Sequence, residues 1–385
     1  MIQIEADTLY ERLKFVDNGT MRQSGGMYSL VCVERIGDTV FFRAFNHVAH
    51  SLAKADADPG EPFRLLFNPS PLLNAISRVS GILDVEIDAE GHRINVSGPV
   101  RLKHSCTDGE DFIEFPEQTV DPVQLKGGGT LSGAIAKAGN AVEENNPNPR
   151  FAGIYLGDRH TPGTVCCVGA STTGLIEVEM GNASSAENFE GESIVPAQAL
   201  GQIRSVLESE PSPHLYISER EASFVGETYA ACSMLVADKY PNYPAIMPDA
   251  DSCQSIRMDR KEAEKGLRIC EEYTEDYSPI YLDFEGDTLT IRSEESEGGV
   301  ASYEVSIETT EMGRMRLKCS AEKMLNIVGG MSGRTLTISV PIEESPTRVL
   351  IEGEENRITG GLALMRLQPH EQLKEQEPAR EPVPA

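Results

Sequence analysis

The sequence predicts an α+β protein built from three similar domains, each with two helices and antiparallel sheets. Proline-punctuated linkers at residues 108–117 and 236–248 divide the chain near one third and two thirds of its length. The strand-like segments alternate polar and apolar residues with period two, which is typical of antiparallel sheets with one covered face. We therefore expect domains at 1–120, 121–248 and 249–367, followed by a disordered tail at 368–385, which is rich in Glu, Gln and Pro.

The repeat can be measured in the second helix of each third. Two columns of apolar residues recur there at intervals of 127 and 124 residues. A period this long exceeds that of solenoid repeats, so each unit is expected to be a whole domain. The two columns are Leu73, Leu200 and Met324, and Ile76, Ile203 and Ile327.

The first third begins with a strand and an amphipathic helix. Asp7 or Thr8 is expected to cap this helix, because such side chains accept hydrogen bonds from free backbone N–H groups. A second helix is expected to begin at Ser70-Pro71, since proline is tolerated in a first turn. The expected strands are 2–4, 27–34, 39–45, 63–67, 83–87, 93–96 and 100–106.

The other two thirds repeat this order of helices and strands. Between them, proline fixes φ and disfavours helix, so residues 236–248 are expected to form a rigid, extended linker. The expected helices are 131–142, 197–207, 260–273 and 321–329. The expected strands are 153–156, 164–168, 174–180, 214–217, 222–225, 229–236, 280–284, 288–293, 301–307, 335–340, 348–352 and 361–367.

Composition limits the class of protein. No apolar run approaches the ~18 residues of a membrane helix, and the first residues lack a signal-peptide pattern, so a cytoplasmic protein without a membrane partner is expected. The eight cysteines are scattered without zinc-site spacing, so reduced thiols, no metal and no cofactor are expected. The net charge of −27 argues against a nucleic-acid-binding surface, unless the basic residues gather in one place.

Four motifs, in order, resemble those of the bacterial sliding clamp, the DNA polymerase III β subunit family. They are Pro149-Arg-Phe-Ala-Gly-Ile-Tyr-Leu156, Ser193-Ile-Val-Pro196, Lys239-Tyr-Pro-Asn-Tyr-Pro-Ala-Ile-Met-Pro248 and Leu364-Met-Arg-Leu367. The resemblance covers residues 1–367. It implies a DNA-clamp fold and a head-to-tail homodimeric ring around duplex DNA, with helices lining the hole. It also implies a non-catalytic processivity factor whose partners are replicative DNA polymerase, clamp loader and other proteins with clamp-binding motifs.

The implied ring assigns the basic helix residues to the DNA-facing side, while acidic residues crowd the linkers, loops and strands. Pro71 replaces the family's basic residue at the start of the second helix, which removes one expected contact. The candidate DNA-binding residues are Arg12, Lys14, Arg78, Lys137, Arg204, Lys261, Lys265, Arg268 and Lys323, with Arg22, Asn145 and Arg150 near the ring face.

The resemblance also implies a pocket for short Gln-Leu-containing peptides and a seam between subunits. Ala245 stands where the family commonly has arginine, so the pocket is expected to be less basic. The pocket residues are Phe151, Ala170, Thr172, Thr173, Gly174, Leu175, Pro241, Ala245, Ile246, Gly361, Ala363, Met365, Arg366 and Leu367. The seam residues are Arg101, Leu102, Lys103 and His104 on one side and Glu271 and Glu272 on the other.

Two alternatives remain open from the sequence. One is a cysteine hydrolase in which Cys166 or Cys167 is the nucleophile and His160 the base. The other is a repeat-built scaffold that never encircles DNA. Gly127-Gly-Gly129 lacks the lysine of a phosphate-binding loop and is expected to be a linker. An inert tail is expected, although it carries Gln372-Leu373, a weak match to the partner motif; the alternative is that this match competes for the pocket.

Overall fold

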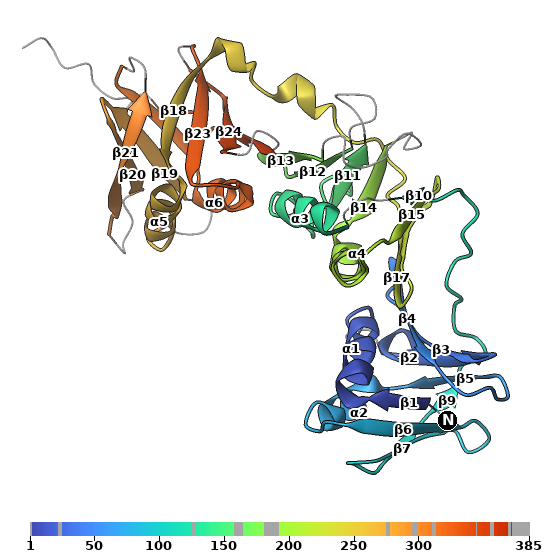
Figure 1. Cartoon of the computed structure of the whole chain (residues 1–385). Coiled ribbons are helices and arrows are strands. Elements are labelled where there is room, and N and C mark those ends of the chain that lie inside the picture. The colour runs from blue at the N-terminus through green and yellow to red at the C-terminus, as the bar shows by residue number, and fades with distance from the viewer. Residues whose placement is uncertain are drawn as a thin grey trace, which may run out of the picture. The chain divides into compact units, whose positions relative to one another are not determined.

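The computed structural model describes residues 2–371 except 22–24, 125–127, 158–164, 181–191, 275–277, 295–298, 310–312, 344, 355–357 and 369–370. The chain forms two compact units (Figure 1). Unit 1 comprises residues 1–136, 144–167 and 180–240, and unit 2 comprises 137–143, 168–179 and 241–385. Helix α3 (Gly128–Gly139) and strand β12 (Cys166–Ala170) are divided between them.

Unit 1 contains two antiparallel arrangements of strands. One has the order β1-β6-β7-β8, and the other β10-β15-β16-β17-β4-β3-β2-β5-β9. These strands are β1 (Ile2–Glu5), β2 (Val31–Ile36), β3 (Thr39–Phe45), β4 (Ala49–Asp56), β5 (Phe63–Phe67), β6 (Ile82–Asp88), β7 (Arg93–Ser97), β8 (Leu102–Ser105), β9 (Thr107–Asp108), β10 (Val123–Gln124), β15 (His214–Ile217), β16 (Glu221–Val225) and β17 (Tyr229–Met234). Two more strands of unit 1, β11 (Gly153–Gly157) and β14 (Ser193–Pro196), pair antiparallel with each other.

The helices of unit 1 bury their apolar faces on these strands. Helix α1 (Ala6–Asp17) packs on β3 and β4 and contacts α2 (Pro69–Ile76), while α4 (Ala197–Ser209) packs on β17. Asn68 caps α2 by accepting a hydrogen bond from the Ser70 backbone, and Pro69 needs no donor in that first turn. Strands β17 and β4 pair directly, which joins the first two thirds of the chain into one unit.

Unit 2 is built on strands in the order β13-β25-β24-β23-β18-β21-β20-β19-β22. Helices α5 (Arg260–Glu271) and α6 (Ala321–Gly330) lie beside one another and pack on these strands (Figure 1). The strands are β13 (Gly174–Glu179), β18 (Cys253–Asp259), β19 (Pro279–Glu285), β20 (Thr288–Ser293), β21 (Ser302–Thr309), β22 (Met315–Ser320), β23 (Thr335–Pro341), β24 (Arg348–Gly353) and β25 (Ile358–Ala363).

Most predicted elements are present, with boundaries that differ by a few residues. Strands β3, β5, β15 and β20 have the predicted bounds. The predicted cap of α1 is wrong: the helix begins at Ala6 after Glu5, which makes no side-chain cap. The strand predicted over 27–34 is also split, because residues Met27–Ser29 form a 3-10 turn before β2. The division into three domains stays a prediction.

Two further expectations need correction. The proline-rich linker is not extended throughout, since residues Tyr243–Ile246 form a 3-10 turn with Pro244 in its first turn. The tail prediction fails at Glu371, whose side chain is buried with 8% exposure and hydrogen-bonded. Gln372 and Leu373 lie outside the described residues. None of the helices within the described residues combines the length and apolar character needed to cross a membrane.

Candidate functional site

The final strand, β13 and the proline-rich linker come together within unit 2. Strands β13 and β25 pair antiparallel with Leu175 opposite Gly361, and the Ala363 backbone donates a hydrogen bond to the Thr173 carbonyl at 2.7 Å. A Cβ built on Gly361 would lie 2.6 Å from the sulfur of Met247, so the linker packs directly over this glycine. Glycine at this position leaves room for the end of the Met247 side chain, which any added side chain would displace.

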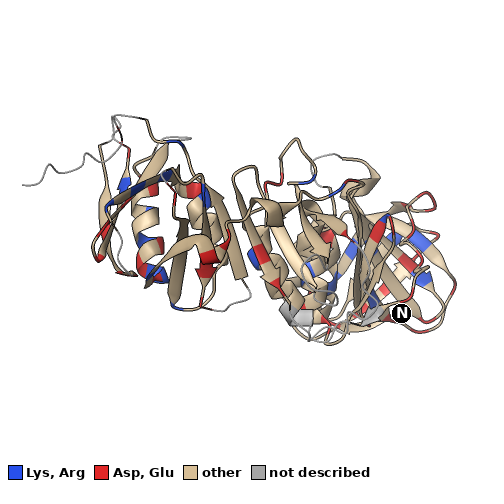
Figure 2. Cartoon of the chain, turned by 90° about the horizontal axis from the view of Figure 1, so that it is seen from above, with Lys and Arg blue, Asp and Glu red and all other residues tan. Residues whose placement is uncertain are grey.

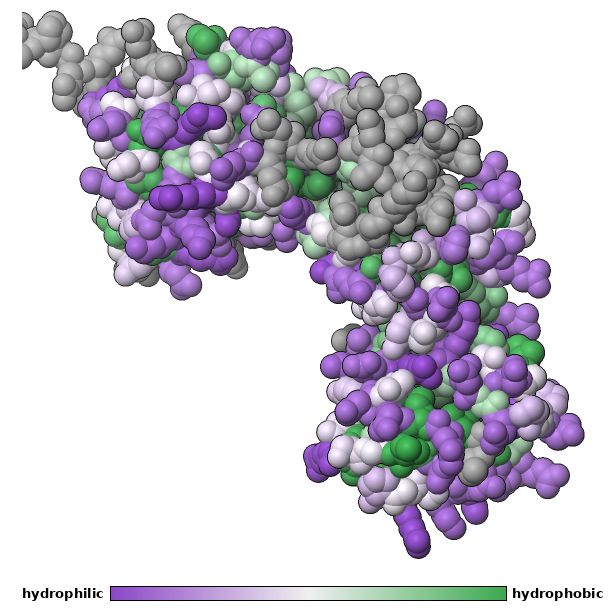
Figure 3. All heavy atoms as spheres, in the orientation of Figure 1, coloured by the Kyte–Doolittle hydropathy of each residue, from purple (hydrophilic) through white to green (hydrophobic). Residues whose placement is uncertain are grey.

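The predicted peptide-binding residues divide by exposure. Ile246 is 54% exposed and Met365 38% exposed, although both are large and apolar, and Figure 3 shows hydrophobic patches among hydrophilic residues on the face that it draws. Ala170, Leu175 and Gly361 are instead buried. Thr172, Thr173, Ala245, Ala363 and Arg366 are exposed, whereas Gly174, Pro241 and Leu367 are half-buried. Phe151 is half-buried in unit 1.

A buried hydrogen bond anchors the linker turn to β13. The Tyr243 hydroxyl donates to a Glu177 carboxylate oxygen at 2.7 Å, and the two residues are only 1% and 8% exposed. A buried carboxylate depends on such donors, because its desolvation is costly. The bond therefore fixes the turn that presents Ile246.

We expect Tyr243→Phe to lower the free energy of unfolding of the protein by about 2 kcal/mol, because it removes a hydrogen-bond donor from a buried carboxyl oxygen of Glu177. Urea titration followed by circular dichroism measures the change. Tyr303→Phe is the matched control, since the Tyr303 hydroxyl donates to Glu262 at 2.6 Å at an exposed position. The control should stay within about 0.5 kcal/mol of the native protein. Equal costs for the two variants would contradict the anchoring role.

The helices are nearly neutral, in contrast to the whole chain. The helices α1 to α6 of the described chain carry nine Lys and Arg and eight Asp and Glu residues, a net charge of +1 against −27 for the full sequence. Lys and Arg are interspersed with Asp and Glu over both units (Figure 2). With the helix bounds of the structure, the helices are less acidic than the rest of the chain, as the sequence predicts.

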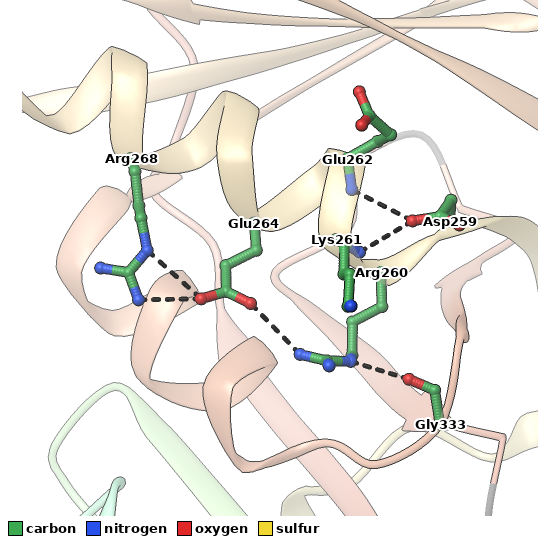
Figure 4. A network of polar contacts seen from close by, with 7 residues as sticks. All are labelled: Asp259, Arg260, Lys261, Glu262, Glu264, Arg268 and Gly333. Carbon is green, nitrogen blue, oxygen red and sulfur yellow. Dashed lines mark hydrogen bonds and ion pairs between the residues drawn. The ribbon is translucent and has the colours of Figure 1, made fainter.

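Several candidate DNA-binding cations are already paired with acids. On α5, the Glu264 carboxylate accepts hydrogen bonds from Arg268 at 2.8 Å and from Arg260 at 3.2 Å (Figure 4). The same bond with Glu264 raises the pKa of Arg268. Exposed pairs of this kind contribute only about 0–1 kcal/mol, so a phosphate can replace the carboxylate. The other paired candidates are Arg150 with Asp238 at 2.7 Å, Arg204 with Glu208 at 3.2 Å and Lys323 with Glu143 at 2.7 Å.

The remaining DNA candidates differ in their surroundings. Lys14 lies over the ring of Tyr10 and Lys265 over that of Tyr303, at 5.4 and 5.1 Å from the ring centres. Lys137 donates to the Ser332 hydroxyl at 2.5 Å. Arg78, Asn145 and Lys261 are exposed, Arg12 is half-buried, and Arg22 lies outside the described residues.

The predicted seam residues lie at an edge strand and at a helix end. Strand β8 ends the order β1-β6-β7-β8, and it carries Leu102, Lys103 and His104, with Arg101 exposed just before it. Edge strands offer free backbone groups to another chain. Burial lowers the pKa of His104. On the other side, Glu271 ends α5 and Glu272 is its C-cap.

The thiols do not form a nucleophilic site. Cys166 and Cys167 are 2% and 0% exposed, and burial together with the charge of Cys166 raises the pKa of the Cys167 thiol. A buried thiol with a raised pKa is inert rather than nucleophilic. His160 lies outside the described residues. Among the described residues, His, Cys, Asp and Glu form no cluster suited to a metal ion.

The comparisons with known proteins add independent information. No family model matches the chain. Over 175 residues, 44% of its length, the chain is 27% identical to the beta sliding clamp of Treponema pallidum, and the match spans 46% of that protein, about half. The structure is similar to DNA polymerase III subunit beta of Pseudomonas aeruginosa, with TM-score 0.84 and 17% identity over 95% of this chain and 100% of that one.

Two other solved structures agree. Pol III beta of Caulobacter crescentus gives TM-score 0.84 at 18% identity, over 95% of this chain and 100% of that one. A sliding clamp of Bartonella birtlesii bound to griselimycin gives 0.83 at 16% identity, over 95% and 99%. The chain has the sliding-clamp fold. The DNA-clamp fold predicted from the sequence is therefore confirmed, as is the resemblance that predicted it.

One feature of this clamp fold was missed from the sequence. Tyr281, Asp283, Arg316 and Lys318 of neighbouring strands form a polar cluster that holds Glu371. The available signal is the alternation of Arg316 and Lys318 on one strand, which places both side chains on one face. Their partners become evident only once the strand register is known.

Proposed function

We propose that this chain is a DNA polymerase sliding clamp, a non-catalytic processivity factor that encircles duplex DNA as a head-to-tail homodimer. The observation that carries the proposal is the structural similarity to DNA polymerase III beta subunits over 95% of the chain, with the same fold at TM-score 0.84. Its partners would be the replicative polymerase, the clamp loader and other proteins with clamp-binding motifs. The similarity of 175 residues to a beta sliding clamp supports the same function.

The charge distribution suits a protein held on DNA by topology. Proteins that bind DNA through phosphate contacts carry many unpaired cations and lose affinity steeply with salt. Here the helices carry a net charge of only +1, and Arg204 and Arg268 are paired with glutamates. Weak contacts of this kind would let a ring slide along the duplex, while the acidic remainder repels DNA from other surfaces.

We expect the protein to remain on circular DNA and to leave it once both strands of the DNA are cut. Dimers opened by dilution are mixed with nicked plasmid, concentrated so that rings close, and passed over a sizing column at about 0.3 M NaCl, where phosphate-mediated binding is weak. The protein should elute with circular plasmid. After cutting with a restriction enzyme, it should elute alone.

The matched control is the same plasmid linearised before mixing, which should retain almost no protein. Retention on linear and circular DNA to the same extent would contradict a ring and favour the scaffold alternative. Ring closure is monitored in the same samples by sedimentation, so that a failure to dimerise is separated from a failure to encircle DNA.

A further inference from the structure

The backbone after β25 runs beside an edge strand of unit 2. Strand β22 ends the strand order of this unit, and its Lys318 carbonyl accepts a hydrogen bond from the Met365 backbone at 2.7 Å. The Leu364 backbone donates to the Thr347 carbonyl at 2.8 Å. These two bonds fix the start of the segment that follows β25. The candidate peptide-binding residues Met365, Arg366 and Leu367 lie at this start.

Six residues after Met365, the Glu371 side chain is held by a second set of bonds. Its carboxylate accepts hydrogen bonds from the Lys318 ammonium at 2.6 Å, the Tyr281 hydroxyl at 2.5 Å and the Gln368 backbone at 2.5 Å. The Arg316 guanidinium donates to the Glu371 carbonyl at 2.7 Å. Lys318 therefore binds both ends of the segment, through its carbonyl and through its ammonium group.

The groups around Glu371 are positioned by the sheet itself. Tyr281 pairs with Lys318 and Asp283 with Arg316 across strands β19 and β22, and Arg316 makes two hydrogen bonds to Asp283, at 2.5 and 2.7 Å. The side-chain cations of Arg316 and Lys318 each lie 5.4 Å from the ring centre of Tyr281, a distance at which a cation is attracted to the ring. The site is thus rigid and rich in donors, which suits a carboxylate.

The electrostatics favour the ionised form of Glu371. Burial alone would raise its pKa. The hydrogen bonds from Lys318, Tyr281 and the Gln368 backbone outweigh this effect and lower the pKa to about 2. Arg292 lies 5.1 Å over the same tyrosine ring. Glu294 is the nearby negative charge, with a carboxylate oxygen 3.3 Å from the Tyr281 hydroxyl oxygen. Because the pKa is below its ordinary value, the stabilisation is complete at neutral pH and is lost progressively as the pH falls below about 4.5 towards 2.

We propose that Tyr281, Arg316 and Lys318 form a carboxylate-binding site whose ligand is Glu371 of the chain's own tail, which latches residues 365–368 onto strand β22. The effect of this latch on partners rests on the proposed function. Met365 is 38% exposed with Glu371 seated, so the latch leaves this residue accessible. It therefore preorganises the peptide-binding surface, and its release costs affinity, because a partner must then order the segment.

Hydrogen exchange in the full-length protein tests the latch directly. Glu371→Gln keeps the shape but removes the charge, so the Met365 and Gln368 amides should exchange at least about tenfold faster. Glu304→Gln is the matched control, because Glu304 is an exposed glutamate of the same unit. It should leave both rates unchanged. Exchange at these amides that is the same in Glu371→Gln and native protein would overturn the latch.

A binding experiment in trans tests the carboxylate site. A synthetic peptide of residues 366–376 is added to full-length Glu371→Ala protein, whose site is vacated, and binding is followed by fluorescence anisotropy. The peptide with glutamate at position 371 should bind at least about tenfold more tightly than the same peptide with glutamine at that position. The reason is that charge-assisted hydrogen bonds are about twice as strong as neutral ones. Lys318→Met in the same protein should remove this preference. Equal binding of the two peptides would overturn the site.

The consequence for partners is measured separately. A Gln-Leu-containing partner peptide should bind Glu371→Gln about three- to tenfold more weakly than native protein, because preorganisation is lost. Tighter binding would overturn the preorganising role and indicate competition by the tail. Exchange and trans binding need neither DNA nor polymerase, so the latch can fail while circular DNA is still retained, and the proposed function can fail while the latch is still found.

Discussion

Met365→Ala and Ile246→Asp are each expected to lower the affinity for a Gln-Leu-containing partner peptide at least about 30-fold, as expected for hot-spot side chains worth 2 kcal/mol or more. Both residues are large, apolar and exposed, at 38% and 54%. They lie on segments that unit 2 holds firmly, since Met365 is bonded to Lys318 and the turn containing Ile246 is anchored through Tyr243. Isothermal titration calorimetry with one synthetic peptide measures the loss.

The control must separate a lost contact from a general effect of a new charge. Ile342→Asp serves this purpose, because Ile342 is 78% exposed in the same unit and outside the candidate surface. It should bind the peptide like the native protein, and all three variants should keep the native sedimentation coefficient. Native affinity in both Met365→Ala and Ile246→Asp would show that the peptide binds elsewhere.

The fold could be predicted from the sequence wherever periodicity was strong. Helices α4 and α6 and strands β3 and β20 show clear apolar spacing, and their predicted bounds are correct within two residues. Strand β4 was missed because its first five residues are all buried and include His50 and Ser51, so no polar–apolar alternation is visible. Its pairing with β17 is set by a partner about 180 residues away, which no local pattern reports.

The candidate site could be predicted in part, where local sequence motifs mark it. The linker, β13 and β25 residues were predicted from the motif resemblance and stay a prediction as a peptide site, although the structure brings those of unit 2 together. The Glu371 site could not be found, since its ligand is 90 residues from Tyr281 and 53 from Lys318. The composition of the tail predicts disorder for the segment as a whole. Several hydrogen-bond donors to one buried carboxylate are nevertheless enough to hold Glu371 in place.

Gly169→Ala is expected to destabilise the protein by about 3 kcal/mol, at the upper end for an overpacked core position. Gly169 lies in β12, where an added Cβ would be 1.8 Å from the Ala138 carbonyl oxygen and 2.6 Å from its carbon. Backbone atoms cannot rotate away, so the strand must move from the end of α3. Because Ala170 follows directly and leads into the Thr172–Leu175 turn, peptide binding should weaken as well. The midpoint of urea unfolding and the same calorimetric titration measure both effects.

Gly329→Ala is the matched control for this prediction. Gly329 lies in α6 of the same unit, and a Cβ there would meet nothing within 4 Å. Alanine favours helix over glycine by about 1 kcal/mol, so this variant should unfold at an equal or higher urea concentration. The two substitutions add the same methyl group, so opposite signs would trace the cost to the contact with Ala138. A Gly169→Ala protein as stable as Gly329→Ala would show that β12 does not pack against the end of α3.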